Sequence, residues 1–265
     1  MVARQRPRRS ELKYLVREGD RQRLARALAP YLRPDPHAGA PDSSAPAPSG
    51  PGYWVRSVYY DTPGLRDWSE KASGDETRRK VRVRAYGAPG ESPVFLEVKR
   101  KSNMGVWKDR AALAPEQAAA LLNGGALDAL TEPLAPEART AAERFLYRLR
   151  AEHRRPVLLV TYWREPLVGR FDPSLRVTLD RALRVRAHPG GALDTLWAPR
   201  QRPVHPGRFI LEVKFDRAYP SWLRPLVGRL GLRQQALSKY AMGMEAEAAR
   251  SAWRFGRPAV AALAR

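Results

Sequence analysis

The residues of this chain best suited to chemistry are lysines and arginines that recur at every second position. Lys80, Arg82 and Arg84 form one such run, and Lys108 and Arg110 form another. Successive side chains of a strand point to opposite faces of a sheet, so residues two apart share a face. Each run therefore places its cations together, where they would attract a polyanion such as a chain of phosphates.

Carboxylates alternate with cations in further segments of the same kind. The pairs are Glu11 with Lys13, Glu97 with Lys99, Glu212 with Lys214, and Arg176 with Asp180. An ordinary antiparallel sheet with one face in water would explain the alternation alone. However, like charges opposite one another on paired strands destabilise a sheet, so gathered cations favour a face that holds an anion.

These residues need strands to position them, and the sequence predicts strands separated by groups of helices. Strands are expected at 10–16, 54–60, 77–86, 94–101, 106–113, 157–164, 175–180, 183–187 and 209–215. Helices are expected at 20–32, from 115 to the glycines at 124–125, at 136–150, at 220–228 and from 238 towards 253. Short turns between the strands predict an antiparallel α+β fold. If the sheet closes into a β-barrel with the helices packed outside, the cations would line an interior tunnel.

Composition limits the class of protein further. The 265 residues include 48 Lys and Arg against 27 Asp and Glu, a net charge of +21, which favours anionic partners. The absence of cysteine excludes disulfides, thiolate zinc sites and thiol nucleophiles. No apolar run reaches the ~18 residues of a membrane span, so we expect a soluble, cytoplasmic protein. We predict a basic tail at 1–9, one domain at 10–254 with a flexible Pro/Ala/Ser-rich loop at 34–52, and a tail at 255–265.

Several segments, in order, resemble the VTC domain, a branch of the triphosphate tunnel metalloenzyme superfamily. They include Glu-Leu-Lys-Tyr at 11–14, Ser-Val-Tyr-Tyr-Asp-Thr-Pro at 57–63, Arg-Lys-Val-Arg-Val-Arg at 79–84, Phe-Leu-Glu-Val-Lys at 95–99 and Val-Trp-Lys-Asp-Arg at 106–110. The others are Tyr-Trp-Arg at 162–164, Arg-Val-Thr-Leu-Asp at 176–180, Leu-Glu-Val-Lys-Phe at 211–215 and Leu-Ser-Lys-Tyr at 237–240. The resemblance implies a triphosphate tunnel that extends inorganic polyphosphate from the terminal phosphate of ATP with a divalent metal.

The resemblance also implies roles for individual residues. The implied catalytic residues, which would contact the transferred phosphate, are Arg82, Arg84, Lys99 and Arg164. The implied phosphate-binding residues are Lys13, Lys108 and Lys239. The strand faces add Lys80, Arg110, Arg176 and Lys214 to the phosphate-binding set. Glu212 is the implied ligand for Mg²⁺ or Mn²⁺, with Glu11, Glu97 and Asp180 as further candidates. The wider superfamily often opens with Glu-x-Glu-x-Lys, and Arg9 replaces its first carboxylate here, which favours the VTC branch over a two-metal hydrolase.

Two other functions remain open from the sequence. A triphosphatase would hydrolyse inorganic or nucleoside triphosphate, and a binding module would hold polyphosphate or nucleic acid without turnover. His37, His153, His188 and His205 show no metal spacing and are expected at the surface, so the chain offers no evident general base. An incoming phosphate chain is already an ionised nucleophile, whereas hydrolysis must activate water, and this favours transfer.

Some residues are expected to have structural roles. Tyr59 and Tyr60 are expected to pack in the core, and residues 61–63 are expected to form a turn. The charged helical residues Glu143, Arg144, Arg148 and Arg150 are expected to form a solvated face. Ser238 is expected to cap the last helix, whose first amide groups would also suit an anion.

Overall fold

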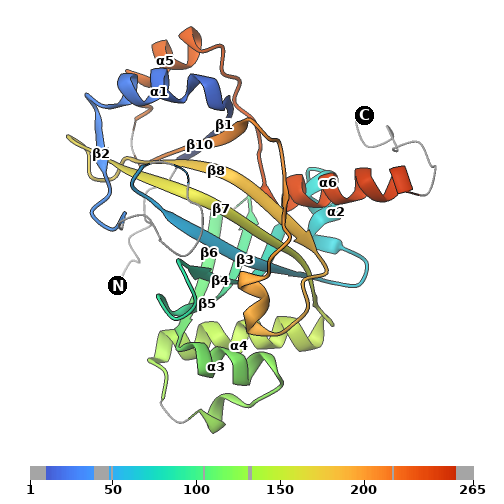
Figure 1. Ribbon diagram of the computed structural model, residues 1–265. Coiled ribbons are helices and arrows are strands. Elements are labelled where there is room, and N and C mark those ends of the chain that lie inside the picture. The colour runs from blue at the N-terminus through green and yellow to red at the C-terminus, as the bar shows by residue number, and fades with distance from the viewer. Residues whose placement is uncertain are drawn as a thin grey trace. The chain divides into compact units, whose positions relative to one another are not determined.

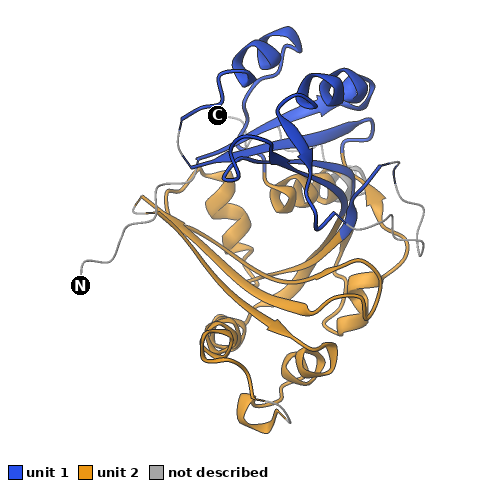
Figure 2. Cartoon of the chain, turned by 90° about the vertical axis from the view of Figure 1, so that its left-hand side faces the viewer, with its two compact units in different colours: residues 1–54, 162–183, 205–237 blue, residues 55–161, 184–204, 238–265 orange. Residues whose placement is uncertain are grey.

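The computed structural model describes residues 10–38, 48, 50–103, 105–130, 133–216 and 218–254. The predicted tails at 1–9 and 255–265, and most of the predicted loop at 34–52, lie outside these residues. The chain forms two compact units, coloured separately in Figure 2. The first comprises residues 1–54, 162–183 and 205–237, and the second comprises residues 55–161, 184–204 and 238–265.

The first unit is built on antiparallel strands with short helices. Its elements are β1 (Ser10–Arg17), a 3-10 turn (Glu18–Asp20), α1 (Arg21–Leu28), β2 (Leu32–Pro34), β10 (Arg208–Phe215) and α5 (Leu223–Arg229), with parts of β7 (Arg155–Gly169) and β8 (Arg176–Ala187). In β10 every second residue, from Phe209 to Phe215, is apolar and buried. Leu24 and Leu28 of α1 pack with Val177, Leu211 and Val213 in one core, so the opposite face of the strands carries their charged residues.

The second unit contains a run of neighbouring antiparallel strands. Its elements are β3 (Tyr53–Asp61), α2 (Arg66–Ala72), β4 (Arg78–Tyr86), β5 (Val94–Ser102), β6 (Gly105–Leu113), α3 (Pro115–Leu122), a 3-10 turn (Leu127–Ala129), α4 (Pro136–Ala151), a 3-10 turn (Leu193–Trp197), β9 (Arg202–Pro203) and α6 (Lys239–Arg254). The helices α3 and α4 lie beside β5 and β6 (Figure 1). Phe145 of α4 packs with Val81, Val83 and Leu96 in the second core, so this face is covered by helices.

Strand pairing confirms the antiparallel α+β fold but not the expected barrel. The strand order is β1-β10-β8-β7-β3-β4-β5-β6, with β2 on β7 and β9 on β8. Among the described strands, β1 and β6 at the two ends of this order do not pair with each other, so the sheet is not closed. The sequence alternation reports which side chains share a face, but closure depends on pairing of the end strands, which alternation does not encode.

Most predicted elements are present, with differences at their ends. The expected strands at 175–180 and 183–187 form the single strand β8, whose backbone bends at Ala182 with a φ of 49°. The first helix ends at Leu28 because Leu32 already begins β2. Ser238 caps α6 as expected, with its Oγ accepting from the Ala241 amide at 3.3 Å. Across the helices described, none combines the length and the apolar character needed to cross a lipid bilayer.

Candidate phosphate-binding site

One face of the second unit carries the cations that the alternation placed together. Register sets Lys80 opposite Lys99 and Lys99 opposite Lys108, and it sets Arg82 opposite Glu97 and Glu97 opposite Arg110. Directly paired residues of a sheet point to the same side. We define the cationic face as Lys80, Arg82 and Arg84 of β4, Lys99 of β5, and Lys108 and Arg110 of β6.

A single buried carboxylate lies at the centre of the cationic face. Glu97 is 1% exposed and contacts Arg82 Nη2 at 2.6 Å, Lys108 Nζ at 2.7 Å and Arg110 Nε at 3.3 Å. Burial raises the pKa of Glu97, but the positive charges of Arg82, Arg84 and Lys108 outweigh burial and hold that pKa well below its usual range. Glu97 is therefore ionised at neutral pH. Three cations share this one carboxylate, and such a concentration of positive charge favours an anionic ligand.

Two arginines of the cationic face donate hydrogen bonds to neighbouring hydroxyl groups. Arg82 Nη1 donates to the Tyr59 hydroxyl at 3.0 Å, and Arg84 Nε donates to Ser57 Oγ at 3.0 Å. Burial raises the pKa of Tyr59, but the charges of Arg82, Lys80 and Arg84 outweigh burial and lower the pKa to about 7. Tyr59 was expected to pack in the core. It is 5% exposed as expected, but its hydroxyl also belongs to the cationic face.

The helix α6 is anchored beside the cationic face by contacts within the second unit. Lys80 Nζ donates to Ser238 Oγ at 2.8 Å, and Tyr240 stacks on Tyr59 with ring centroids 4.9 Å apart. The Tyr240 hydroxyl donates to Asp61 Oδ2 at 2.6 Å. These contacts place the first turn of α6, including the candidate Lys239, next to Lys80 and Tyr59.

Asp61 was expected to lie in a turn, and its structural role is larger. It is fully buried and accepts hydrogen bonds from the backbone amides of Thr62, Asp67 and Trp68 as well as from Tyr240. Asp61 thus links the start of α2 to α6. Its only sequence signal was an acidic residue directly after an apolar strand, which is also typical of an ordinary turn.

The first unit holds the other candidate carboxylates and cations on facing positions of β1, β10 and β8. Register pairs Lys13 with Glu212 and Glu11 with Lys214. Lys13 Nζ lies 2.8 Å from Glu11 Oε1 and 3.8 Å from Glu212 Oε2, and Lys214 forms an ion pair with Glu212. We call Glu11, Lys13, Glu212 and Lys214 the carboxylate–lysine cluster. It brings two carboxylates to one ammonium group.

Arg164 and Asp180 form a second charged group in the first unit. Arg164 donates to Asp180 through Nε at 2.7 Å and through Nη2 at 2.8 Å, a bidentate pair. Burial lowers the pKa of Arg164, but the charge of Asp180 outweighs burial and raises that pKa. Arg176 instead binds Asp35 at 2.8 Å and is about half exposed, and its role with phosphate stays a prediction.

The described residues contain no group of three or more His, Asp or Glu side chains placed to hold a metal ion. Mg²⁺ needs only one or two carboxylates, with phosphate oxygens and water completing its shell. A metal ion at any of the four candidates would have to displace a cationic side chain. Glu11 and Glu212 bring two carboxylates to one point, at Lys13 Nζ, whereas Glu97 and Asp180 each supply one. The metal itself remains a prediction.

The histidines occupy the positions that the sequence predicted. His37, His153, His188 and His205 are all exposed at the surface. None of them lies among the cations of either unit. The candidate residues that the structure brings together are therefore those of the cationic face, the carboxylate–lysine cluster and the Arg164–Asp180 pair.

An antiparallel α+β protein with a cationic sheet face is the class that this geometry defines. A family model described as the VTC domain matches residues 8–247, nearly the whole chain. The chain therefore belongs to the VTC domain family, which is linked to polyphosphate metabolism.

Comparisons with individual proteins add little to the family match. The PH1819 protein of Pyrococcus horikoshii OT3 shares 14% identity over 89% of this chain and 99% of its own, with a TM-score of 0.44. The Schizosaccharomyces pombe Mediator head module shares 13% identity over 83% of this chain and 90% of the matched chain, with a TM-score of 0.35. A comparison with curated proteins found no match.

Proposed function

We propose that this chain extends inorganic polyphosphate by transferring the γ-phosphoryl group of ATP to the end of a growing chain. The observation that supports this most strongly is the cationic face, where six cations share one side of neighbouring strands and three of them contact Glu97. A chain of phosphates carries negative charge at regular short intervals. It is the ligand whose charge density best complements closely spaced cations on neighbouring strands.

The proposed reaction needs positioning and charge stabilisation more than acid–base chemistry. A terminal oxygen of the polyphosphate chain attacks the γ-phosphorus of ATP, and the bond from that phosphorus to the bridging oxygen breaks to release ADP. The attacking oxygen is already ionised, so no side chain has to remove a proton. Arg82 and Arg84 offer planar forks for the oxygens of neighbouring phosphates, and Lys99 and Arg164 are the further cations proposed to stabilise the moving group.

The proposal assigns phosphate binding to the remaining cations and metal binding to carboxylates. Lys13, Lys80, Lys108, Arg110, Arg176, Lys214 and Lys239 are the proposed phosphate-binding residues. Glu212, together with Glu11, would hold Mg²⁺ or Mn²⁺, which supplies charge neutralisation to the phosphate oxygens when bound.

Incubation with ATP, a short polyphosphate primer and Mg²⁺ or Mn²⁺ tests this proposal. Products are resolved by gel electrophoresis while ADP is counted. We expect chains longer than the primer and one ADP for each phosphate added, with loss of both in Arg82→Gln. Arg23→Gln, which removes an exposed cation of α1, is the matched control and should retain activity.

Two other outcomes would overturn the proposal. Orthophosphate released without polymer would identify a triphosphatase. Tight binding of polyphosphate without ADP formation, with either metal, would identify a binding module instead.

A further inference from the structure

The second unit has another charged surface on the opposite side of the cationic strands. Register aligns Arg79 of β4, Arg100 of β5 and Trp107 of β6. They alternate with the cations described above, so they point to the other face of the sheet. The helix α4 lies along this face, and two neighbouring hollows of about 330 and 310 Å³ open there. We call these two hollows the outer groove.

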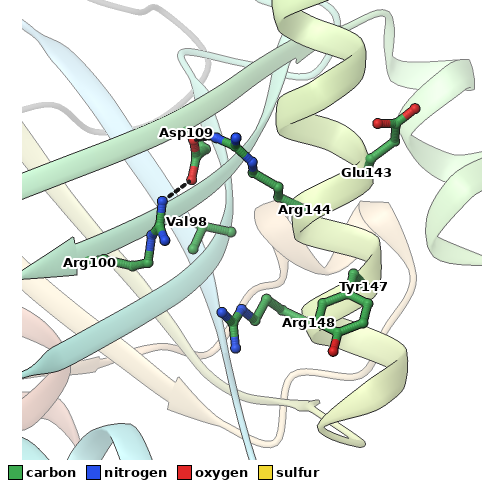
Figure 3. Close-up of a pocket in the computed structure, with 7 residues that line it drawn as sticks. All are labelled: Val98, Arg100, Asp109, Glu143, Arg144, Tyr147 and Arg148. Atoms are coloured by element: carbon green, nitrogen blue, oxygen red, sulfur yellow. Dashed lines mark hydrogen bonds and ion pairs between the residues drawn. The ribbon is translucent and has the colours of Figure 1, made fainter.

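Arg100 and Arg148 line both hollows of the outer groove. In Figure 3, Arg100 and Arg144 both point toward Asp109, while Arg148 and Tyr147 project from α4 below them. Asp109 contacts Arg144 Nη1 at 2.6 Å and Arg100 Nη2 at 3.5 Å. The single negative charge of Asp109 is thus shared by two arginines, so this group of three side chains has a net positive charge.

The same excess of guanidinium groups recurs at the other end of the outer groove. Glu152 forms ion pairs with both Arg79 and Arg148. The buried Nε of Arg100 has no hydrogen-bond partner in the described part of the chain. The side chains of Arg100 and Arg148 are nevertheless 40% and 26% exposed, so the wall shared by the two hollows presents positive charge to an anion. Arg144 and Arg148, which were expected to be merely solvated, take part in this surface.

Each hollow also has an exposed aromatic wall. Tyr147 lines the first hollow and is 65% exposed, and Trp107 lines the second and is 44% exposed. Val106, beside Trp107, is exposed as well. Exposed large apolar side chains that gather on one surface mark an interaction site. An inorganic phosphate chain has no surface for such rings, whereas nucleotide bases stack on them.

We propose that the outer groove binds single-stranded nucleic acid, with adjacent bases stacked on Trp107 and Tyr147 and the phosphate between them on Arg100 and Arg148. Two hollows, each with one ring, match two neighbouring bases. The arginines common to both hollows match the phosphate that joins those bases. This site is separate from the cationic face and does not depend on polyphosphate synthesis. The net charge of +21 further favours a polyanionic partner over a neutral one.

Fluorescence anisotropy of a labelled short oligothymidylate, titrated with the full chain, tests this proposal. We expect Trp107→Ala and Tyr147→Ala each to weaken binding about tenfold, the loss of one stacked base. Phe171→Ala removes another exposed ring, in the first unit, and should leave the affinity unchanged. Arg100→Gln should weaken binding and reduce the slope of log affinity against log salt by about one. Circular dichroism confirms that each variant is folded.

A second ligand separates stacking from charge attraction. An abasic oligonucleotide of the same length and charge loses both stacked bases and should bind about a hundredfold more weakly than oligothymidylate. Equal affinity for the two, or an equal loss in Phe171→Ala, would overturn the proposal. So would binding of an acidic peptide that is lost in Trp107→Ala while oligothymidylate binding is kept. Arg82→Gln should abolish polymer synthesis yet retain oligonucleotide binding, so failure of one proposal does not imply failure of the other.

Discussion

The Tyr59 hydroxyl accepts a 3.0 Å hydrogen bond from Arg82, whose other terminal nitrogen holds Glu97 at 2.6 Å. Arg82 thus lies between a carboxylate and a phenol on the face where six cations gather. The positive charge of Arg82 acts on both Tyr59 and Glu97. The pKa of each is lower than usual, although burial alone would raise it.

Tyr59 should titrate near neutral pH. Its pKa of about 7 lies below the ordinary value of 10, so the folded protein releases a proton that the unfolded chain keeps. The free energy of unfolding should therefore rise with pH between about 7 and 10, and this contribution should be lost as pH falls through 7. Near-ultraviolet difference absorbance should show phenolate forming near pH 7, and Tyr59→Phe should remove that step. A spectrum with no titration below pH 9 would contradict the expectation.

Binding of a polyanion should reverse the ionisation of Tyr59. Negative phosphates close to the phenolate favour its protonated form and raise its pKa. Tripolyphosphate added near pH 8 should therefore reduce the phenolate absorbance and take up protons, measured in buffers of different ionisation enthalpy. An unchanged absorbance at saturating tripolyphosphate would show that the ligand binds elsewhere.

Glu97→Gln should destabilise the protein and make its stability depend on anions. The variant leaves Arg82, Lys108 and Arg110 without their shared carboxylate, and we expect a loss of about 2–3 kcal/mol in urea unfolding. Tripolyphosphate should restore more stability to this variant than to the wild type, because it replaces the missing negative charge. Glu137→Gln, an exposed change in the first turn of α4, is the control and should change stability by less than about 0.5 kcal/mol.

Asp61→Asn should loosen the attachment of α6. Asp61 accepts from three backbone amides and from the Tyr240 hydroxyl, two bonds at each oxygen. Asn keeps one accepting oxygen, and its nitrogen cannot accept the two bonds made to the other. We expect a loss of about 1–3 kcal/mol, with faster hydrogen exchange at the start of α2 and in the first turns of α6. Tyr240→Phe removes only one of the contacts and should cost less. Equal exchange rates in all three proteins would show that Asp61 does not hold these helices.

Two glycines in helices should respond oppositely to alanine. A Cβ at Gly243 of α6 would lie 2.7 Å from Leu158 and 2.8 Å from Val185, so Gly243→Ala should cost about 1–3 kcal/mol. A Cβ at Gly228 of α5 would meet nothing within 4 Å, so Gly228→Ala should stabilise by up to about 1 kcal/mol. Thermal unfolding of the two variants measures both changes in stability. A Gly243→Ala variant as stable as the wild type would contradict the close packing of α6.

The sequence predicted the cationic face because side-chain alternation in a strand is a local property. Neighbouring strands of a meander then pair in a register that aligns Lys80, Lys99 and Lys108. Tyr59 could not be assigned to that face, since an aromatic residue suits a buried core and a binding face equally well. The short helix α2 also escaped prediction, because the residue before it, Leu65, is left-handed and has no capping side chain, and Asp61 binds the first amides of the helix instead. Barrel closure was not predictable because it depends on the two end strands.

Calorimetric titration with tripolyphosphate tests most directly whether the cationic face holds the phosphate chain. Arg82→Gln should weaken binding by at least about tenfold, as expected for the loss of a charge-assisted contact. Arg100→Gln, which removes the same charge from the opposite face of the sheet, should leave the affinity within about twofold. Equal losses in the two variants, or full affinity in Arg82→Gln, would contradict the central claim.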